Sequence, residues 1–246
     1  MKLYGDFTRE DWMKILKIEP RDIPASLIFH GEWDYQPSFR FWKETLADPF
    51  SIPSCNAVIG KYQNQGVGFA NVFGGPMAAV IAHQFAVMGT EHLIQTGYFG
   101  GLSHDLQYGD ILIVTGAQME DGVSQWYLPD QQIVHSDPRL VETAIQYCED
   151  QGYQYVTGTV FSTGAIAVET EEMVSGWAKE GHIGVDMETA ATLSVAGRFH
   201  KKGIGLLNLS DHMIKGDHLF SKTEDRRKIM KETNRKIRDL ALYLAT

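Results

Sequence analysis

The stretch of residues 184–212, GVDMETAATLSVAGRFHKKGIGLLNLSDH, decides how this chain folds. Asp186 and Glu188 stand where a strand gives way to a helix, and Asp211 follows the apolar run 203–209, which is typical of a buried strand. Ligands in α/β sheets bind at the carboxyl ends of strands, so these acids are candidate site residues. The alternative is that they cap helices, because Asp and Glu are favourable at helix N-termini.

The whole chain has 246 residues, of which 43% are hydrophobic and 22% are charged, and it contains 24 glycines. This composition predicts a single globular domain of the α/β class over residues 1–246. A net charge of -9 disfavours a nucleic-acid partner. The sequence has no signal-peptide pattern and no apolar run of about 18 residues, so we expect a cytoplasmic protein without a membrane partner.

Cysteine and histidine spacing predicts no metal site. Cys55 and Cys148 are far apart in the sequence and are expected to be buried thiols. The 9 histidines do not fall in ligand spacing with cysteines or carboxylates. We therefore expect most of the histidines to be structural or to lie on the surface.

Apolar runs and helical patterns alternate on both sides of the central stretch. Glycine-rich residues 97–101 predict a turn after a strand, and the polar, aromatic segment 118–129 predicts a loop. Repeated strand and helix predicts a sheet with helices on both faces. The predicted strands are 25–29, 58–62, 67–73, 92–96, 110–115, 155–160 and 203–209, and the predicted helices are 77–88, 138–150, 171–179 and 223–245.

Four groups of motifs, in this order, resemble the nucleoside phosphorylase family, which includes purine nucleoside phosphorylases, uridine phosphorylases and nucleosidases. The last group is the most specific. The resemblance implies the three-layer fold of that family, with a central twisted mixed sheet flanked by helices. The motifs are IQTGYFGGL (94–102) with GDILIV (109–114), DGVSQWYLP (121–129), FSTGAI (161–166), and GVDMETAA (184–191) with LSDH (209–212).

The resemblance implies a role for each residue of the opening stretch. Glu188 matches the glutamate that hydrogen-bonds the ribose hydroxyls, Met187 matches the methionine under the sugar, and Asp211 matches the acid that donates to N7 of a departing purine. Cleavage of an N-glycosidic bond builds positive charge on the sugar and negative charge on the base, so these groups act where charge develops. Burial behind 203–209 would favour the protonated form of Asp211, and Asp186 is expected to be structural.

Further residues complete the substrate site that the resemblance implies. Ile166 falls near the base-stacking aromatic residue of the family, and Phe161 opens the same motif. Gly97 belongs to the glycine-rich segment, and His212 adjoins Asp211 and is expected to contact the base or the sugar. Arg226 or Arg227 matches the basic residue that closes over the acid in the purine enzymes.

The phosphate positions of the family depart from the pattern in this chain. Gly31 matches the first glycine turn, but the arginine expected after it falls on or near Tyr35. In the second motif, Gln95 stands in the arginine position and Tyr98 in the hydroxyl position. The arginine that a neighbouring subunit supplies falls near Pro53.

Loss of these cations affects which molecule, phosphate or water, can accept the sugar in the reaction. Each charge-assisted contact to phosphate contributes about 1.5–3 kcal/mol. Loss of all three would weaken phosphate binding by several orders of magnitude unless Arg40, Lys43 or Lys61 substitutes.

The leading interpretation is a nucleosidase in which Glu32 or Asp34, near the first turn, activates water. The alternative for these two acids is a solvated turn. The alternative functions are a purine nucleoside phosphorylase with a rebuilt phosphate site and a nucleoside-binding protein without turnover. We expect no cofactor, except phosphate as co-substrate in the phosphorolytic case, and a homo-oligomer with sites near subunit contacts. The base, any 5′ modification of the sugar and the number of subunits stay open.

Overall fold

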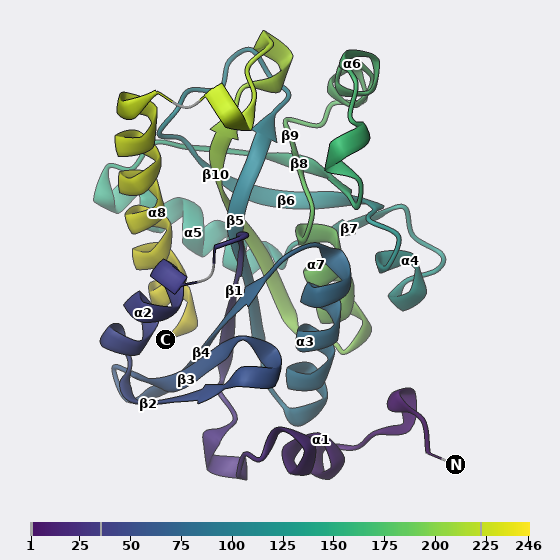
Figure 1. Cartoon of the computed structure of the whole chain (residues 1–246), viewed down its shortest axis with the longest axis vertical. Coiled ribbons are helices and arrows are strands. Elements are labelled where there is room, and N and C mark those ends of the chain that lie inside the picture. Colours follow the sequence, from purple (N-terminus) through teal and green to yellow (C-terminus); the bar gives the residue numbers. More distant parts are fainter. Residues whose placement is uncertain (1, 35, 222) are drawn as a thin grey trace.

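A computed structural model describes residues 2–34, 36–221 and 223–246 of the chain. Within these residues ten strands form one mixed sheet, and helices cover both of its faces (Figure 1). The strand order is β10-β6-β8-β9-β5-β1-β4-β3-β2, with β10 also paired to β5 and β7 paired to β6. The predicted fold class, a central mixed sheet flanked by helices, is confirmed.

The elements follow one another in strand and helix alternation through most of the chain. The strands are β1 (Ser26–Gly31), β2 (Ala47–Ile52), β3 (Ala57–Tyr62), β4 (Gln65–Val72), β5 (His92–Gly101), β6 (Ile111–Glu120), β7 (Ile133–His135), β8 (Tyr155–Thr163), β9 (Gly184–Asp186) and β10 (Lys202–Asp211). The α-helices are α1 (Arg9–Leu16), α2 (Gln36–Thr45), α3 (Gly75–Met88), α4 (Ser124–Tyr127), α5 (Pro138–Gln151), α6 (Glu171–Lys179), α7 (Thr189–Arg198) and α8 (Glu224–Ala245).

The central strands β4, β1, β5 and β10 run parallel, so their carboxyl ends meet at one edge of the sheet. At this edge Gly31 of β1 pairs with Val72 of β4, and Asp211 of β10 pairs with Gly100 of β5. Strand β9 pairs with Gly100 from its other side, through Val185. The acidic residues of the opening stretch are thereby brought to the ends of the parallel strands.

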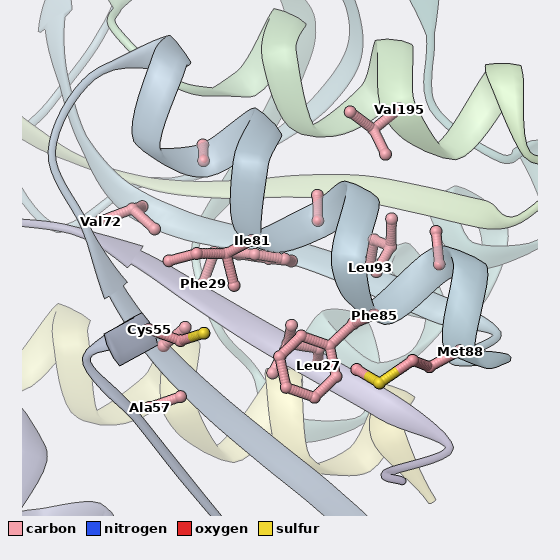
Figure 2. Packing of buried hydrophobic residues seen from close by; sticks show 14 of the residues in the cluster. Leu27, Phe29, Cys55, Ala57, Val72, Ile81, Phe85, Met88, Leu93 and Val195 are labelled. Carbon is pink, nitrogen blue, oxygen red and sulfur yellow. The ribbon is translucent and has the colours of Figure 1, made fainter. Parts of the chain in front are cut away.

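Two apolar clusters hold the helices against the sheet. Side chains of a strand alternate between its faces, so Leu27 and Phe29 of β1 pack with Phe85 of α3 on one face (Figure 2). Ile28 points to the other face and belongs to the same cluster as Leu240 of α8. All five side chains are fully buried, and each such burial stabilises the fold by about 1.5–3 kcal/mol.

Three segments differ from the predicted elements. Residues 97–101 continue β5, because pairing with β9 and β10 outweighs the preference of glycine for turns. Residues 118–120 likewise end β6, where they pair with β7 and β8, and the rest of the predicted loop contains α4. Strand β2 has no counterpart among the predicted elements because it contains Pro49. It pairs only with β3, and proline is tolerated in such an edge strand.

Cys55 and Cys148 are both buried free thiols, as predicted. In the part of the chain that the structure describes, no three His, Cys, Asp or Glu side chains gather in a way that could hold a metal ion. Among the described helices, none has the length and apolar character needed to cross a bilayer.

Candidate active site

Glu188 lies at the N-terminus of α7, with its carboxylate buried against two strand ends. The backbone N–H of Gly74 donates to Oε1 at 2.7 Å. A Cβ built on Gly31 would stand 2.7 Å from Oε2, so only glycine leaves room for this carboxylate. Gly97, with φ +155°, packs against Gly31, since its Cβ would lie 3.2 Å from the Gly31 nitrogen. Gly31 therefore leaves room for Glu188, and Gly97 allows β5 to approach Gly31 from the next strand.

Two buried acids stand side by side at this helix start. Burial raises the pKa of Glu188 to about 8, and the charge of Asp186 adds to the rise. Asp186 accepts hydrogen bonds from the backbone N–H groups of Glu188 at 3.3 Å and Thr189 at 2.8 Å, so it caps the first turn of α7. Asp186 thus has the structural role expected for it, and the half-buried Met187 stands between the two acids.

Asp211 ends β10 and is 5% exposed. The Ser210 hydroxyl donates to its Oδ1. Asp211 and Val185 pair with opposite sides of Gly100, so Asp211 stands at the end of β5. The Glu188 carboxylate lies against Gly31 at the end of β1 and Gly74 just after β4, so both acids lie at the carboxyl edge of the parallel strands.

Glu169 is an acidic residue near Asp211 that the sequence analysis does not single out. It follows the short 3-10 helix η4 (Ile166–Val168) and is half-buried. Burial raises the pKa of Glu169 to about 7, and the charge of Asp211 adds to the rise. Its position three residues after Ile166, in the motif assigned to the base, was the available sequence signal. A carboxyl that titrates near neutrality beside Asp211 can donate to or accept from a bound base.

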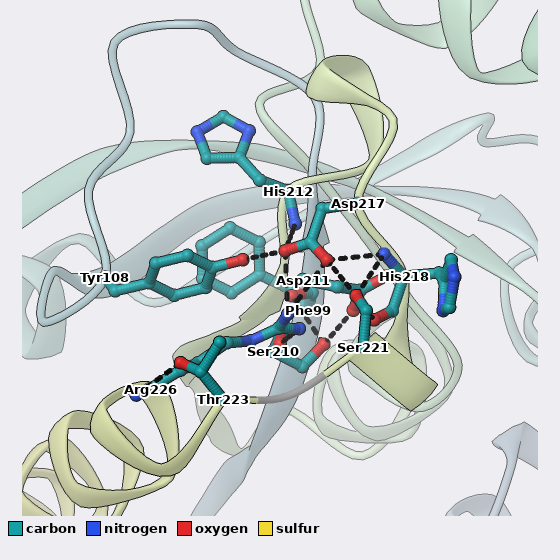
Figure 3. Close-up of polar contacts among 10 residues, drawn as sticks. All are labelled: Phe99, Tyr108, Ser210, Asp211, His212, Asp217, His218, Ser221, Thr223 and Arg226. Atoms are coloured by element: carbon teal, nitrogen blue, oxygen red, sulfur yellow. Dashed lines mark hydrogen bonds and ion pairs between the residues drawn. The ribbon is translucent and has the colours of Figure 1, made fainter.

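Arg226 links residues 212–221, which follow Asp211, to the end of β10 through hydrogen bonds (Figure 3). Its Nη1 donates to both Asp217 oxygens at 2.9 and 2.7 Å, and its Nη2 donates to the carbonyl of Ser210. The guanidinium also lies 4.9 Å from the centre of the Tyr108 ring. Arg226 is buried and Arg227 is exposed, so Arg226 is the arginine that holds residues 212–221 beside Asp211.

Replacement of Asp217 by asparagine is expected to destabilise the protein by about 1–3 kcal/mol at pH 7, because it leaves Arg226 without a charged partner. Burial by itself would raise the pKa of Asp217, but hydrogen bonds from Ser221, Tyr108 and the His218 N–H, with the charge of Arg226, hold it well below the usual range. Such a depressed pKa stabilises the fold above the unfolded value of about 3.9, and this contribution is lost as pH falls toward the folded value.

Urea unfolding of wild type and Asp217→Asn at a series of pH values measures this effect. The difference in unfolding free energy should shrink below about pH 4. Glu224→Gln is the control, because Glu224 and Lys228 form an exposed pair and its loss should change stability by less than about 0.5 kcal/mol. Equal stability of wild type and Asp217→Asn at pH 7 would contradict the fastening role.

Glu32, which follows the first glycine, turns toward α2 and α8. Its Oε2 lies 3.3 Å from His30 Nε2 and 3.4 Å from Ser38 Oγ. The Thr96 hydroxyl donates to the carbonyl of Phe29, so it accepts from His30 Nδ1 at 2.9 Å and leaves His30 Nε2 for Glu32. With Nδ1 donating to Thr96, His30 attracts Glu32 through Nε2 only when the ring is protonated, and this contact is not aligned as a hydrogen bond. The Glu32 side chain is 29% exposed, so water can reach it.

Tyr98 of β5 lies beside Glu32. Asn234 Nδ2 donates to the Tyr98 hydroxyl at 2.6 Å, and the Glu32 carboxylate interacts electrostatically with that hydroxyl. Burial raises the pKa of Tyr98 to about 12, and the charge of Glu32 adds to the rise. Arg238, one turn after Asn234 on α8, interacts electrostatically with both Tyr98 and Glu32 and lies 4.4 Å from the Phe41 ring. Asn234 and Arg238 carry no sequence signal, because the many charged residues of 223–245 are typical of a surface helix.

Gln95, at the position of a phosphate-binding arginine, faces the opposite side of the sheet from Tyr98. Its Oε1 accepts from the Thr192 hydroxyl at 2.7 Å, and its Nε2 donates to the carbonyl of Thr96 at 2.8 Å. Both ends of the fully buried amide are therefore occupied, and Gln95 links β5 to α7.

The other candidate cation positions are exposed, lie at the far end of the sheet or fall outside the described residues. Lys61 pairs with Gly66 at the amino end of β4, which is the far end of the sheet from Gly31. Arg40 and Lys43 are exposed on α2, and Pro53 is exposed at the start of a 3-10 helix. Tyr35 lies outside the described residues.

Three other predicted site residues make contacts within the protein. Asp34 is exposed and accepts from the first backbone N–H of α2 at 3.2 Å. His212 Nε2 lies 2.9 Å from the carbonyl of Leu106, and burial lowers the pKa of His212. The ring of Phe161 stacks on Trp177 with centroids 4.4 Å apart.

Comparison with known proteins identifies relatives of this chain. The family described as the Phosphorylase superfamily matches residues 39–244. The purine nucleoside phosphorylase DeoD-type 2 of Vibrio vulnificus (strain YJ016) is 30% identical over 172 residues, which cover 69% of this chain and 72% of that protein. The purine nucleoside phosphorylase DeoD-type 1 of Shewanella oneidensis is 24% identical over 211 residues, covering 83% of this chain and 88% of that protein.

A similar solved structure is that of uridine phosphorylase from Vibrio fischeri ES114, with a TM-score of 0.80. It shares 19% sequence identity, and the match covers 92% of this chain and 94% of that chain. At this identity the likeness establishes the fold. Together with the family match over 39–244, it confirms the predicted family: the chain belongs to the phosphorylase superfamily, as an enzyme of the nucleoside phosphorylase type.

Proposed function

We propose that the chain cleaves the N-glycosidic bond of a nucleoside, preferably a purine nucleoside, and transfers the sugar to water. The observation that carries the choice of water is the Glu32 carboxylate, which lies with His30 and Tyr98 in the half of the site where the family would bind phosphate. A phosphate dianion would be repelled by this carboxylate, whereas water would be activated by it.

Each acid has one task in the proposed reaction. Water attacks C1′ of the sugar and gives a proton to Glu32, while the C1′–N bond breaks and its electron pair passes to the base. Asp211 protonates the departing base, and Glu188 accepts hydrogen bonds from the ribose hydroxyls. Of the two acids near the first turn, Glu32 is the better candidate for the general base that takes the proton from water. Asp34 is exposed, and its carboxylate accepts a hydrogen bond from the first backbone N–H of α2.

A second candidate function is phosphorolysis, with phosphate in place of water. The names of the Vibrio and Shewanella relatives favour it, and Arg238 supplies a cation next to Tyr98 and Glu32. Phosphate would then have to bind beside the negatively charged Glu32, and among the described residues Arg238 would be the cation close to it.

Incubation of a nucleoside panel with and without phosphate is expected to separate the two reactions. Hydrolysis predicts free base and free ribose in phosphate-free buffer, with little change when phosphate is added. Chromatography of base and sugar products measures this, and purine nucleosides should react faster than pyrimidine nucleosides because only purines offer N7 to Asp211. Base release that depends strictly on phosphate and yields ribose 1-phosphate would contradict the proposal. The expected homo-oligomer stays a prediction, which light scattering on a sizing column would test.

A further inference from the structure

We propose that His30 of β1 acts through Glu32, as a positioning residue that also takes over the proton which Glu32 removes from water. The inference rests on the proposed function, because it concerns the group to which water activation is assigned. It gives a task to His30 Nε2, a buried nitrogen that forms no hydrogen bond within the described part of the chain.

The neighbouring hydrogen bonds fix where a neutral His30 ring carries its proton. The Thr96 hydroxyl has one proton and donates it to the carbonyl of Phe29 at 2.7 Å, because a carbonyl can only accept. In the contact of 2.9 Å between His30 Nδ1 and Thr96 Oγ1, Nδ1 is therefore the donor. A neutral imidazole has a single N–H, so His30 Nε2 is then an acceptor.

The ring is held so that this acceptor faces Glu32. His30 is buried, and its ring contacts those of Tyr98 and Phe69, with centroids 5.7 and 6.5 Å away. A half-turn of the ring would lose the hydrogen bond to Thr96. Nε2 thereby stays 3.3 Å from Glu32 Oε2.

The main chain of Glu32 is fixed to the end of β4. Its N–H donates to the carbonyl of Val72 at 3.1 Å, and its carbonyl accepts from Asn71 Nδ2 at 2.8 Å. Ser38 Oγ lies 3.4 Å from Oε2, the same carboxylate oxygen that faces His30. The carboxylate is therefore held beside Nε2, while 29% of the side chain is open to water.

Two acceptors at this distance repel each other, and the contact becomes attractive when the pair takes up one proton. In the reaction one O–H bond of water breaks as its oxygen attacks C1′, and the proton goes to Glu32. It then passes from Oε2 to Nε2, which leaves a carboxylate beside an imidazolium, and the ring releases it to solvent. The poor alignment without substrate is compatible with this transfer, because catalytic hydrogen bonds often tighten only in the complex.

The other charged or titratable groups that face the pair keep their protonation state near neutral pH. Tyr98 from β5 and Arg238 from α8 both interact electrostatically with Glu32. Burial raises the pKa of Tyr98 to about 12, and an arginine side chain stays charged. A pH dependence that disappears with His30 therefore belongs to the pair.

His30→Gln removes the acceptor nitrogen. We expect it to lower kcat for phosphate-free hydrolysis of a nitrophenyl riboside roughly 10- to 100-fold, with KM nearly unchanged. In the wild type kcat should fall at low pH when the ring is protonated and cannot take a second proton. In the variant this fall should begin at lower pH, because carboxylic acids titrate below imidazoles. This substrate keeps the protonation of Asp211 out of the measurement, since nitrophenol leaves without a proton.

Thr96→Val tests the proposal without a change in His30. Without the hydroxyl, a neutral ring can carry its proton on Nε2, which then donates to Glu32 and cannot accept, so kcat should fall here too. Nitrogen NMR of the wild type should show neutral His30 protonated at Nδ1. His200→Gln is the matched control, because His200 is exposed and precedes β10 at the opposite end from Asp211. It should leave kcat and its pH dependence unchanged.

Normal kcat in His30→Gln, or a neutral wild-type ring with its proton on Nε2, would overturn the inference while wild-type hydrolysis still supported the proposed function. A lowered kcat whose fall at low pH stays where it is in the wild type would show a merely structural role and overturn it too. Strict dependence of the wild type on phosphate would overturn both proposals.

Discussion

Asp211→Asn is expected to lower the rate of purine nucleoside cleavage roughly 10²- to 10⁴-fold, which is the usual contribution of a general acid. Asparagine keeps the size of the side chain, and the Ser210 hydroxyl can donate to its amide oxygen as it does to Asp211 Oδ1. The amide cannot give a proton to the base, so negative charge builds up on the leaving group. Binding of the nucleoside should persist, since the sugar contacts of Glu188 are untouched.

Steady-state kinetics and calorimetric titration of the nucleoside separate these two effects. A nitrophenyl riboside, whose leaving group needs no proton, should be cleaved by Asp211→Asn at close to the wild-type rate. Asp137→Asn is the matched control, because Asp137 caps α5 near the amino end of β10 and asparagine caps a helix equally well. Near-normal cleavage of purine nucleosides by Asp211→Asn would remove Asp211 from the reaction.

Glu188→Gln is expected to lower kcat/KM for ribonucleosides by about 100-fold or more, because hydrogen bonds to a charged acceptor contribute about 1.5–3 kcal/mol each. The pKa of Glu188 is raised to about 8 by burial and by Asp186, so at pH 7 most of the free protein carries a protonated Glu188. Since kcat/KM reports the free enzyme, it should rise with pH up to about 8 and then level off.

In Glu188→Gln, kcat/KM should not rise with pH up to 8, because the glutamine side chain does not titrate. The pH profile of kcat/KM for wild type and variant measures the difference. A 2′-deoxynucleoside, which offers one hydroxyl fewer, should lose less from the substitution than the ribonucleoside does. A wild-type profile that is flat between pH 6 and pH 9 would contradict the assignment of Glu188.

The same raised pKa has a consequence for stability. Between the ordinary glutamate pKa of 4.5 and about 8, the folded protein holds a proton on Glu188 that the unfolded chain has released. The folded state therefore loses stability as pH rises through that window. Glu188→Gln should therefore gain in Tm relative to wild type as pH increases to about 8, at about 2–4 °C for each kcal/mol. Glu142→Gln, on the exposed face of α5, is the control. Parallel curves of Tm against pH for wild type and Glu188→Gln would show that burial does not raise the pKa of Glu188.

Local sequence signals were sufficient for most of the fold and for two residues of the proposed site. Apolar runs and cap residues act over a few neighbouring positions, so the strand before Gly31, the strand before Asp211 and helix α8 could all be predicted. Glu188 and Asp211 could be picked out for the same reason, since each stands at a junction of elements. The motif order then assigned them to the sugar and the base.

Predictions from local sequence differ from the structure where strand pairing outweighs a local preference. Glycine-rich residues 97–101 have the composition of a turn, yet they are strand because β9 and β10 border Gly100 on both sides. Gln95 was predicted to face the acceptor, but the alternation of side chains along β5 directs it to α7, where Thr192 meets it. Neither result can be derived from neighbouring residues alone.

The sequence by itself determined the order of strands and helices and the family, and it singled out Glu188 and Asp211 as candidates. Only the tertiary structure decided that Tyr98 of β5 meets Asn234 of α8 beside Glu32, which follows β1. The physical reason is that hydrophobic periodicity encodes which face of an element is buried, whereas side-chain hydrogen bonds depend on which elements become neighbours. That neighbourhood is set by the order of β10, β5 and β1 in the sheet, which brings together residues far apart in the chain.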